Sequence, residues 1–281
     1  MPNKVSQDLV MPQYAGFEVK IVTKNDLKND SKTEVDLSTI SSNRVELLKQ
    51  SKKAEFSNYS FNVGGSSHVG KVDFVNALNM KFWDGLERKR DVVFPGAILS
   101  VSGGGIQAAG SFVKFARKVS EEVGYQGQLF LLVLGTNDAS NALLDQSEYF
   151  EQYQELCKAL LSIPKLVLMP TSLLPRSYDS KFPQRNPNML PTSDTIRAVC
   201  ADLRRDSQLA NRVKFVNAYD NIGELKTDSK LGIKTLVPLK GMLKKDNVHL
   251  TPDASKILAD NLLKGANLLH NKVLNSPTNN L

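Results

Sequence analysis

The chain has 281 residues, of which 41% are hydrophobic and 23% charged, as in a soluble globular protein with a sizeable core. Its longest apolar run, at 129–134, is too short to span a bilayer, and the N-terminal residues lack the apolar segment of a secretory signal, so we expect a cytoplasmic protein without a membrane span. The net charge of +7 is spread along the chain without a basic block, which favours a solvated surface and leaves nucleic acid or another polyanion as a weaker alternative partner.

Beyond residue 57, short apolar runs alternate with longer amphipathic segments. The predicted strands are 59–63, 92–101, 129–134, 166–169 and 213–216, and the predicted helices are 71–86, 106–123, 146–161, 194–206 and one that begins at Pro252. This alternation predicts an α/β fold in which helices cover both faces of a mostly parallel sheet. Five prolines predict a long loop at 170–194.

The domain organisation follows from the same distribution of apolar and polar segments along the chain. Residues 1–55 are polar with weak periodicity, and we expect an extension that is partly ordered at best. We expect one domain at 56–270 and a flexible tail at 271–281. The two cysteines, Cys157 and Cys200, lie in helix-like segments without a C-x-x-C partner, which predicts buried free thiols.

The loop after the first predicted strand is rich in glycine and has two interpretations. Gly65-x-x-x-x-Gly70-Lys71 matches a phosphate-binding P-loop, except that Val72 replaces the Ser or Thr that ligates Mg²⁺. Alternatively, the turn exposes a nucleophilic serine. The missing hydroxyl disfavours the nucleotide-binding interpretation without removing it.

The loop after the second predicted strand, at 102–108, also contains a glycine cluster. It resembles a dinucleotide fingerprint, but the acidic residue that such a site needs is missing, since the next strand ends in Gly135. The glycines Gly103 and Gly104 nevertheless allow backbone N–H groups to approach a ligand closely.

Two further loops carry polar side chains with catalytic chemistry. Asn137 follows the third strand, where its amide could donate to an oxyanion or simply form a turn. Asp246 and His249 precede the last helix, which Thr251 caps and Pro252 opens. An aspartate three residues before a histidine can hold the imidazole by its Nδ1–H, as a general base requires. The other histidines, at positions 68 and 270, are weaker candidates.

Together the four loops resemble the four sequence blocks of the SGNH hydrolase family of GDSL-type esterases. The resemblance covers about residues 57–268, and its most specific parts are 135–138 and 246–251. The matching residues are Ser67, Gly103, Asn137, Asp246 and His249. It implies a three-layer α/β/α sandwich with a flavodoxin-like sheet.

The first and second blocks depart from the family pattern or leave it ambiguous. The family reads Gly-Asp-Ser where this chain has Gly65-Ser66-Ser67. We align Ser67 to the nucleophile because Ser-His-Val at 67–69 resembles a Gly-Asp-Ser-His-Val variant in esterase-like domains of some mobile elements and viruses. Ser66 is the alternative register, and Gly104 is nearly equal to Gly103 in the second block.

The resemblance implies a serine esterase that uses no metal or other cofactor and acts on a small-molecule ester. Ser67 is the implied nucleophile, His249 the general base and Asp246 the residue that orients it. The implied oxyanion hole consists of the N–H groups of Ser67 and Gly103 or Gly104 and the Asn137 amide.

The absence of an aspartate before the nucleophile keeps a different class of function open, a catalytically weak SGNH fold that serves as a binding or accessory protein. Nearby basic residues also hint at an anionic substrate; they are Arg176, Lys181, Arg185, Lys240, Lys244 and Lys245. The oligomeric state does not follow from the sequence.

Overall fold

The computed structural model of the chain has at its centre a five-stranded, entirely parallel sheet in the order β1-β3-β2-β4-β5. It describes residues 18–23, 59–87, 94–121, 127–141, 143–176, 187–227, 229 and 232–274. The strands of this sheet are β1 (Glu18–Thr23), β2 (Tyr59–Gly65), β3 (Phe94–Ser102), β4 (Gly127–Val133) and β5 (Leu166–Pro170). The helices are α3 (Val72–Glu87), the 3₁₀ turn η2 (Ile106–Ala108), α4 (Ala109–Glu121), α5 (Gln146–Leu161), α6 (Met189–Leu203) and α7 (Pro252–Leu274).

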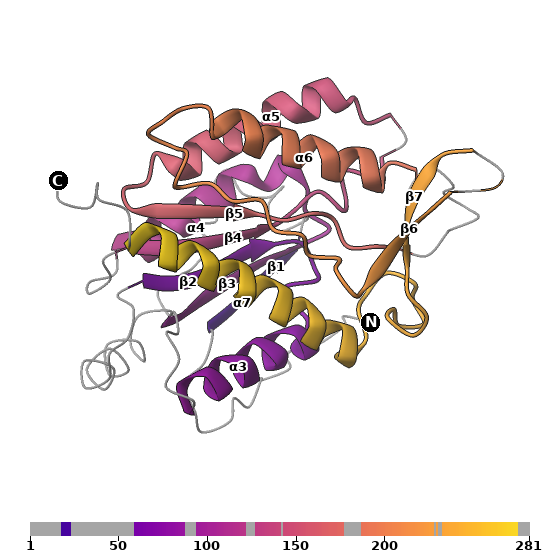
Figure 1. The fold of residues 1–281 in the computed structure, drawn as a ribbon, viewed down its shortest axis with the longest axis horizontal. Helices are drawn as coiled ribbons and strands as arrows, with labels where there is room; N and C mark the ends of the chain where they lie inside the picture. The colour runs from indigo at the N-terminus through magenta and orange to yellow at the C-terminus, as the bar shows by residue number, and fades with distance from the viewer. Residues whose placement is uncertain are drawn as a thin grey trace, which may run out of the picture.

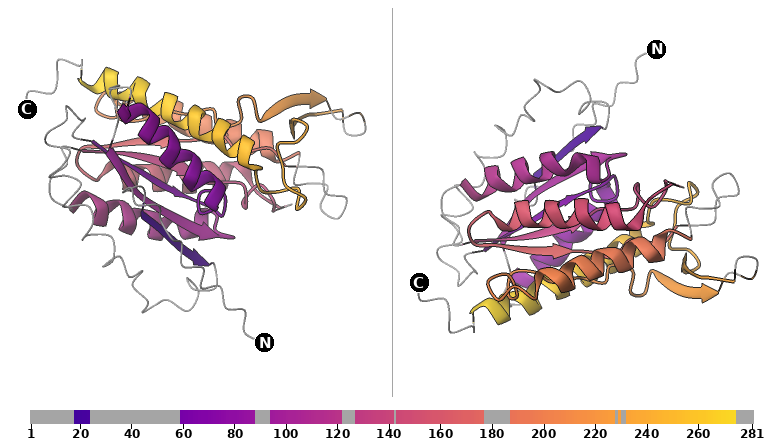
Figure 2. Two further views of the ribbon diagram at one scale, coloured as in Figure 1. Left: turned by 90° about the horizontal axis from the view of Figure 1, so that it is seen from below. Right: turned by 90° about the horizontal axis from the view of Figure 1, so that it is seen from above.

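Two helical layers enclose the sheet, α3 and α7 on one face and α4, α5 and α6 on the other (Figures 1 and 2). Successive strand residues alternate between two apolar clusters: Leu132 packs with the α4–α6 layer, and Leu131 packs with the α3–α7 layer. Because both faces are covered, the strands are continuous apolar runs. The predicted α/β/α sandwich of the SGNH hydrolase fold is therefore confirmed.

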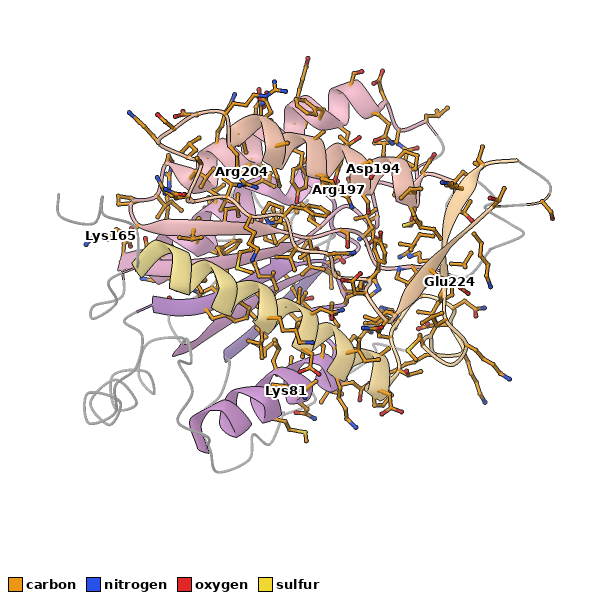
Figure 3. All side chains as sticks on the ribbon, in the orientation of Figure 1. Lys81, Lys165, Asp194, Arg197, Arg204 and Glu224 are labelled. Carbon is orange, nitrogen blue, oxygen red and sulfur yellow. The ribbon has the colours of Figure 1, made fainter. Side chains whose placement is uncertain are left out.

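The α3–α7 layer joins the first loop of the sheet to the last helix. Lys81 lies on α3 beside α7 (Figure 3), and its Nζ is 3.0 Å from Oδ1 of Asp260. Helix α7 begins as expected, with Pro252 in its first turn and the Thr251 hydroxyl accepting a 3.4 Å hydrogen bond from the Ala254 N–H.

Several elements differ from the sequence-based expectations. β1 pairs with β3 at the sheet edge, so part of the segment 1–55 belongs to the sheet, while the rest lies outside the described residues. The expected strand at 213–216 forms only isolated bridges to Leu168 and Thr171. Helix α6 begins at Met189 rather than at 194, because a proline is tolerated in the first turn, where its missing N–H has no intrahelical acceptor.

Two further features concern the C-terminal half. An antiparallel hairpin of β6 (Gly223–Thr227) and β7 (Lys234–Pro238), not expected from the sequence, projects from the side of the molecule to which the parallel strands point (Figure 1). Helix α7 continues to Leu274, so its last turn occupies part of the expected tail 271–281. The exact domain boundaries stay predictions.

Candidate active site

The carboxyl edge of the parallel sheet brings the predicted site residues together. Ser67 lies in the turn between β2 and α3, and His249 lies in the loop that leads into α7. The Oγ of Ser67 is 3.1 Å from Nε2 of His249, although 182 positions separate them in the chain. The Nδ1 of His249 is 2.6 Å from Oδ2 of Asp246. The three side chains thus form one continuous hydrogen-bonded chain.

The structure distinguishes the two serine registers. Ser67 is partly exposed at the sheet edge, whereas Ser66 is 1% exposed. The Ser66 N–H donates to the Val133 carbonyl, and its hydroxyl is 3.4 Å from Nδ1 of His68. Only Ser67 has its hydroxyl within hydrogen-bond distance of His249 among the described residues.

The Asp246 carboxylate is held in its charged form. Its Oδ1 accepts the backbone N–H groups of Val248 and His249 at 3.0 and 2.9 Å, and its Oδ2 faces the imidazole. Burial alone would raise the pKa of Asp246, but these hydrogen bonds outweigh it and hold that pKa well below its ordinary value. An ionised carboxylate stabilises a His249 imidazolium and fixes Nδ1 as the protonated nitrogen of the neutral ring.

The loops after β3 and β4 face the serine turn with backbone and amide donors. The Asn137 side-chain N–H donates to the Gly104 carbonyl at 2.6 Å, which fixes the amide and leaves its second hydrogen available. The Gly104 N–H is already donated to Val101 O at 3.0 Å, a difference that favours Gly103 as the backbone donor. Among the described residues, the Ser67 N–H has no hydrogen-bond partner.

Asp138 is a structural contributor to this edge that the sequence analysis assigned no role. Its Oδ1 accepts the Ile106 N–H at 2.9 Å and so joins the loop after β4 to the start of η2. Gly135 opens the same loop at a φ of +116°, and a Cβ there would come within 2.7 Å of the Tyr149 hydroxyl oxygen. The positions of Gly103 and Asn137 therefore depend on contacts between loops, which spacing in the sequence does not reveal.

A cavity of about 420 Å³ opens beside Gly103 and Asn137. It lies between the β3 and β4 loops and the start of α5, and its lining contains carboxylates and amides but no lysine or arginine; the polar lining side chains are Gln107, Asn137, Asp138, Asn141, Asp145, Glu148, Tyr149 and Gln152. It therefore adjoins Gly103 and Asn137, the candidate oxyanion donors.

The basic residues that hinted at an anionic substrate have different surroundings. Lys244 pairs with Asp73 at the start of α3, while Lys240 and Lys245 are exposed. Arg176 is buried and donates to the Ser140 hydroxyl at 2.8 Å. Lys181 and Arg185 lie outside the described residues.

Neither metal-binding nor thiol chemistry is apparent in the described part of the chain. No cluster of three histidine, cysteine or acidic residues there could hold a metal ion. Cys157 and Cys200 are free and buried, as the sequence predicted, and burial raises the pKa of Cys200 to about 12. Within the same described residues, no helix is long and apolar enough to cross a membrane.

Comparison with known proteins decides the family. The model of the family described as GDSL-like Lipase/Acylhydrolase matches residues 30–262. The chain belongs to this family. As a GDSL-like acylhydrolase it is a carboxylic ester hydrolase, and small-molecule esters are its class of substrate. No curated protein matches the chain.

Two solved structures with TM-scores above 0.5 confirm the fold of this GDSL-like acylhydrolase at low sequence identity. A carbohydrate esterase family 3 protein from Talaromyces cellulolyticus is 13% identical, with a TM-score of 0.53 over 76% of this chain and 99% of that one. A mutant acetyl esterase with acetate ion is also 13% identical, with a TM-score of 0.52 over 76% and 99% of the two chains. A GDSL-like lipase from Bacteroides thetaiotaomicron is 16% identical, with a TM-score of 0.47 over 77% and 89%. At such identities the likeness concerns the fold alone.

Proposed function

We propose that this acylhydrolase cleaves a carboxylic ester through an acyl-enzyme on Ser67. The observation that carries the proposal is the continuous chain from the Ser67 hydroxyl through His249 to Asp246, with contacts of 3.1 and 2.6 Å. These distances are those of a nucleophile, a general base and the carboxylate that orients the base.

In the acylation step, the Ser67 oxygen attacks the ester carbonyl while His249 Nε2 accepts the hydroxyl proton. The carbonyl oxygen becomes an oxyanion, which the N–H groups of Ser67 and Gly103 and the free amide hydrogen of Asn137 stabilise. As the carbonyl re-forms, the bond to the alkoxy group breaks, and the imidazolium returns its proton to the departing alcohol.

Deacylation repeats these steps with a water molecule in place of the serine hydroxyl. His249 takes a proton from the water, whose oxygen attacks the acyl carbon in the same oxyanion hole. The bond to Ser67 then breaks, and the serine oxygen recovers the proton from His249. Asp246 keeps its negative charge throughout and stabilises both imidazolium stages. Replacement of the family's block-one aspartate by Ser66 removes no group from this sequence of steps.

A fluorophosphonate probe tests the proposal, because it forms a covalent adduct only with an activated serine. Intact-mass measurements should show one adduct on the wild type and on Ser66→Ala, and none on Ser67→Ala or His249→Ala. The wild type should also hydrolyse short-chain p-nitrophenyl esters. An adduct that survives Ser67→Ala, or a wild type without adduct or ester hydrolysis, would overturn the proposal.

A further inference from the structure

The residue next to the proposed nucleophile is an unusually buried histidine. His68 is 4% exposed, whereas its neighbour Ser67 is partly exposed. Burial first, and then the positive charge of Arg176, lowers the pKa of His68 to about 3. Its ring is therefore neutral at ordinary pH and carries one N–H group.

The two ring nitrogens of His68 have different partners, which fix the tautomer. Nε2 is 3.1 Å from the carbonyl oxygen of Val248. A carbonyl can only accept a hydrogen bond, so Nε2 carries the hydrogen and Nδ1 is left as an acceptor. The Ser66 hydroxyl, 3.4 Å from Nδ1, is placed to donate to it. The side chain thus joins the serine turn to the loop before α7.

The carbonyl that accepts the hydrogen bond from His68 lies next to the proposed general base. Val248 directly precedes His249, and its own N–H donates to Asp246 at 3.0 Å. The rings of His68 and His249 are 5.4 Å apart, close enough for displacement of one loop to alter the other. Apart from the contact between Ser67 and His249, this is the side-chain hydrogen bond that joins residues 66–71 to the loop before α7 in the described part of the chain; the same loop also reaches the first turn of α3, where Lys244 pairs with Asp73.

We propose that His68 is a positioning residue, which holds the loop of His249 at the distance that the attack by Ser67 requires. The inference rests on the proposed esterase function for its catalytic meaning. His68 does not itself exchange a proton with substrate, since Nε2 faces a peptide carbonyl and Nδ1 faces Ser66. A displacement of about 1 Å in such a loop would weaken the 3.1 Å contact and slow the chemistry far more than substrate binding.

The test compares two substitutions of nearly equal length. His68→Gln keeps an N–H group at the position of Nε2, whereas His68→Met fills similar space without a donor. On a short-chain p-nitrophenyl ester, we expect kcat of the Met variant to fall at least about tenfold with KM nearly unchanged, and the Gln variant to stay within about threefold of wild type. Both are assayed well below their measured melting temperatures, so that lost folding is not counted as lost positioning.

Amide hydrogen exchange gives a readout that does not need activity. The N–H groups of Val248 and His249 are protected by Asp246 only while the loop keeps its conformation, so their exchange should be faster in the Met variant than in the Gln variant. Equal kcat and equal exchange in the two variants would overturn the positioning role. A wild type without ester hydrolysis or fluorophosphonate adduct would overturn the proposed function instead, while the exchange comparison would still show whether His68 holds the loop.

Discussion

Asn137 has two amide hydrogens, and the Gly104 carbonyl takes one of them. The other is the side-chain donor proposed for the oxyanion. We expect Asn137→Ala to lower kcat by about 10²–10³-fold with a small change in KM, because the oxyanion exists only in the transition state and the intermediates. Initial rates on a short-chain ester measure this effect.

A matched control for this prediction comes from α7. Asn261 also donates its amide to backbone carbonyls, those of Ala218 and Asp220, but it does so away from Ser67. Asn261→Ala should change stability without a comparable loss of kcat. If the two variants lose the same activity, Asn137 has no special role at the oxyanion.

The lowered pKa of the buried His68 also makes the stability of the protein depend on pH. Above its ordinary pKa of 6.5 the ring is neutral in the folded and unfolded chains, and it adds no pH dependence. Below 6.5 the unfolded chain takes up a proton that the folded chain, with a pKa of about 3, does not. Stability therefore falls as the pH falls through this window, by up to about 1.4 kcal/mol per pH unit from this group.

Urea unfolding of the wild type and His68→Gln, at about pH 7 and about pH 5.5, measures this contribution. The window lies above the range in which most carboxylates titrate, and the other histidines are common to both proteins. The unfolding free energy of the wild type minus that of the variant should be smaller at about pH 5.5 than at about pH 7, by up to about 1.4 kcal/mol, because only the wild type loses stability through this group. Parallel pH profiles would show that the His68 ring is not kept neutral in the folded chain.

At the residue scale, the sequence predicted the members of the site better than their supports. Ser67, Asn137, Asp246 and His249 could be proposed because each follows a strand or precedes a helix in a pattern typical of one family. The role of His68 could not be predicted, because its hydrogen bond to the Val248 carbonyl joins two loops that are far apart in the sequence. The hydrogen bond from Ile106 to Asp138 escaped the sequence analysis for the same reason.

At the element scale, the buried Asn62 side chain stabilises a register shift between two strands of the sheet. The register between β2 and β3 shifts between Phe61 and Val63, and the Oδ1 of Asn62 accepts the Ala97 N–H there at 2.9 Å. The amide of Asn62 donates to the Ser60 hydroxyl at 2.9 Å. A Cβ at Gly96 would lie 2.1 Å from the Asn62 oxygen, so only glycine allows this close approach.

Because Asn62 is fully buried, its loss leaves the Ala97 N–H without an acceptor. We expect Asn62→Ala to lower the free energy of unfolding by about 2–3 kcal/mol, measured by urea denaturation. Ser60→Ala, which removes only one acceptor of the Asn62 amide, should cost about 1 kcal/mol. Equal losses would mean that the Asn62 side chain does not satisfy the shifted backbone.

The elements themselves were predictable where periodicity and caps agreed. Helix α5 was expected at the bounds that it occupies because its apolar residues recur at helical spacing. The structure adds an N-cap at Asp145, whose side chain accepts two backbone N–H groups. β1 was missed because an edge strand with polar residues has a weak period-2 signal. The β6–β7 hairpin was missed for a similar reason, as most of β6 is exposed.

At the scale of the whole molecule, two oppositely charged regions border the site. The cavity beside Gly103 is lined by carboxylates, including Asp145 and Glu148, whereas the exposed Lys240 and Lys245 lie in the loop before His249. A substrate that extends into the cavity meets the carboxylates, so we expect esters with an anionic acyl or alcohol part to be poorer substrates than neutral esters of the same shape.

A charge-neutralising variant tests this expectation. Asn is as good a helix cap as Asp, so Asp145→Asn combined with Glu148→Gln should leave α5 intact. It should raise kcat/KM for the anionic esters by roughly threefold to tenfold at low salt and leave neutral esters unchanged. A wild-type preference for anionic esters that disappears in Lys240→Ala/Lys245→Ala would instead establish that the lysines select the substrate.

The distance along the chain between Ser67 and His249 has a consequence for how the enzyme is made. A ribosome adds about 5–20 residues each second, so the 182 positions between them take roughly 10–40 s. During this time the growing chain contains the proposed nucleophile but neither the proposed base nor the Val248 carbonyl that His68 contacts. Since α7 must also dock before the His249 loop is held, the proposed ester cleavage can begin only after α7 has been synthesised, and we expect shorter nascent chains to lack this activity.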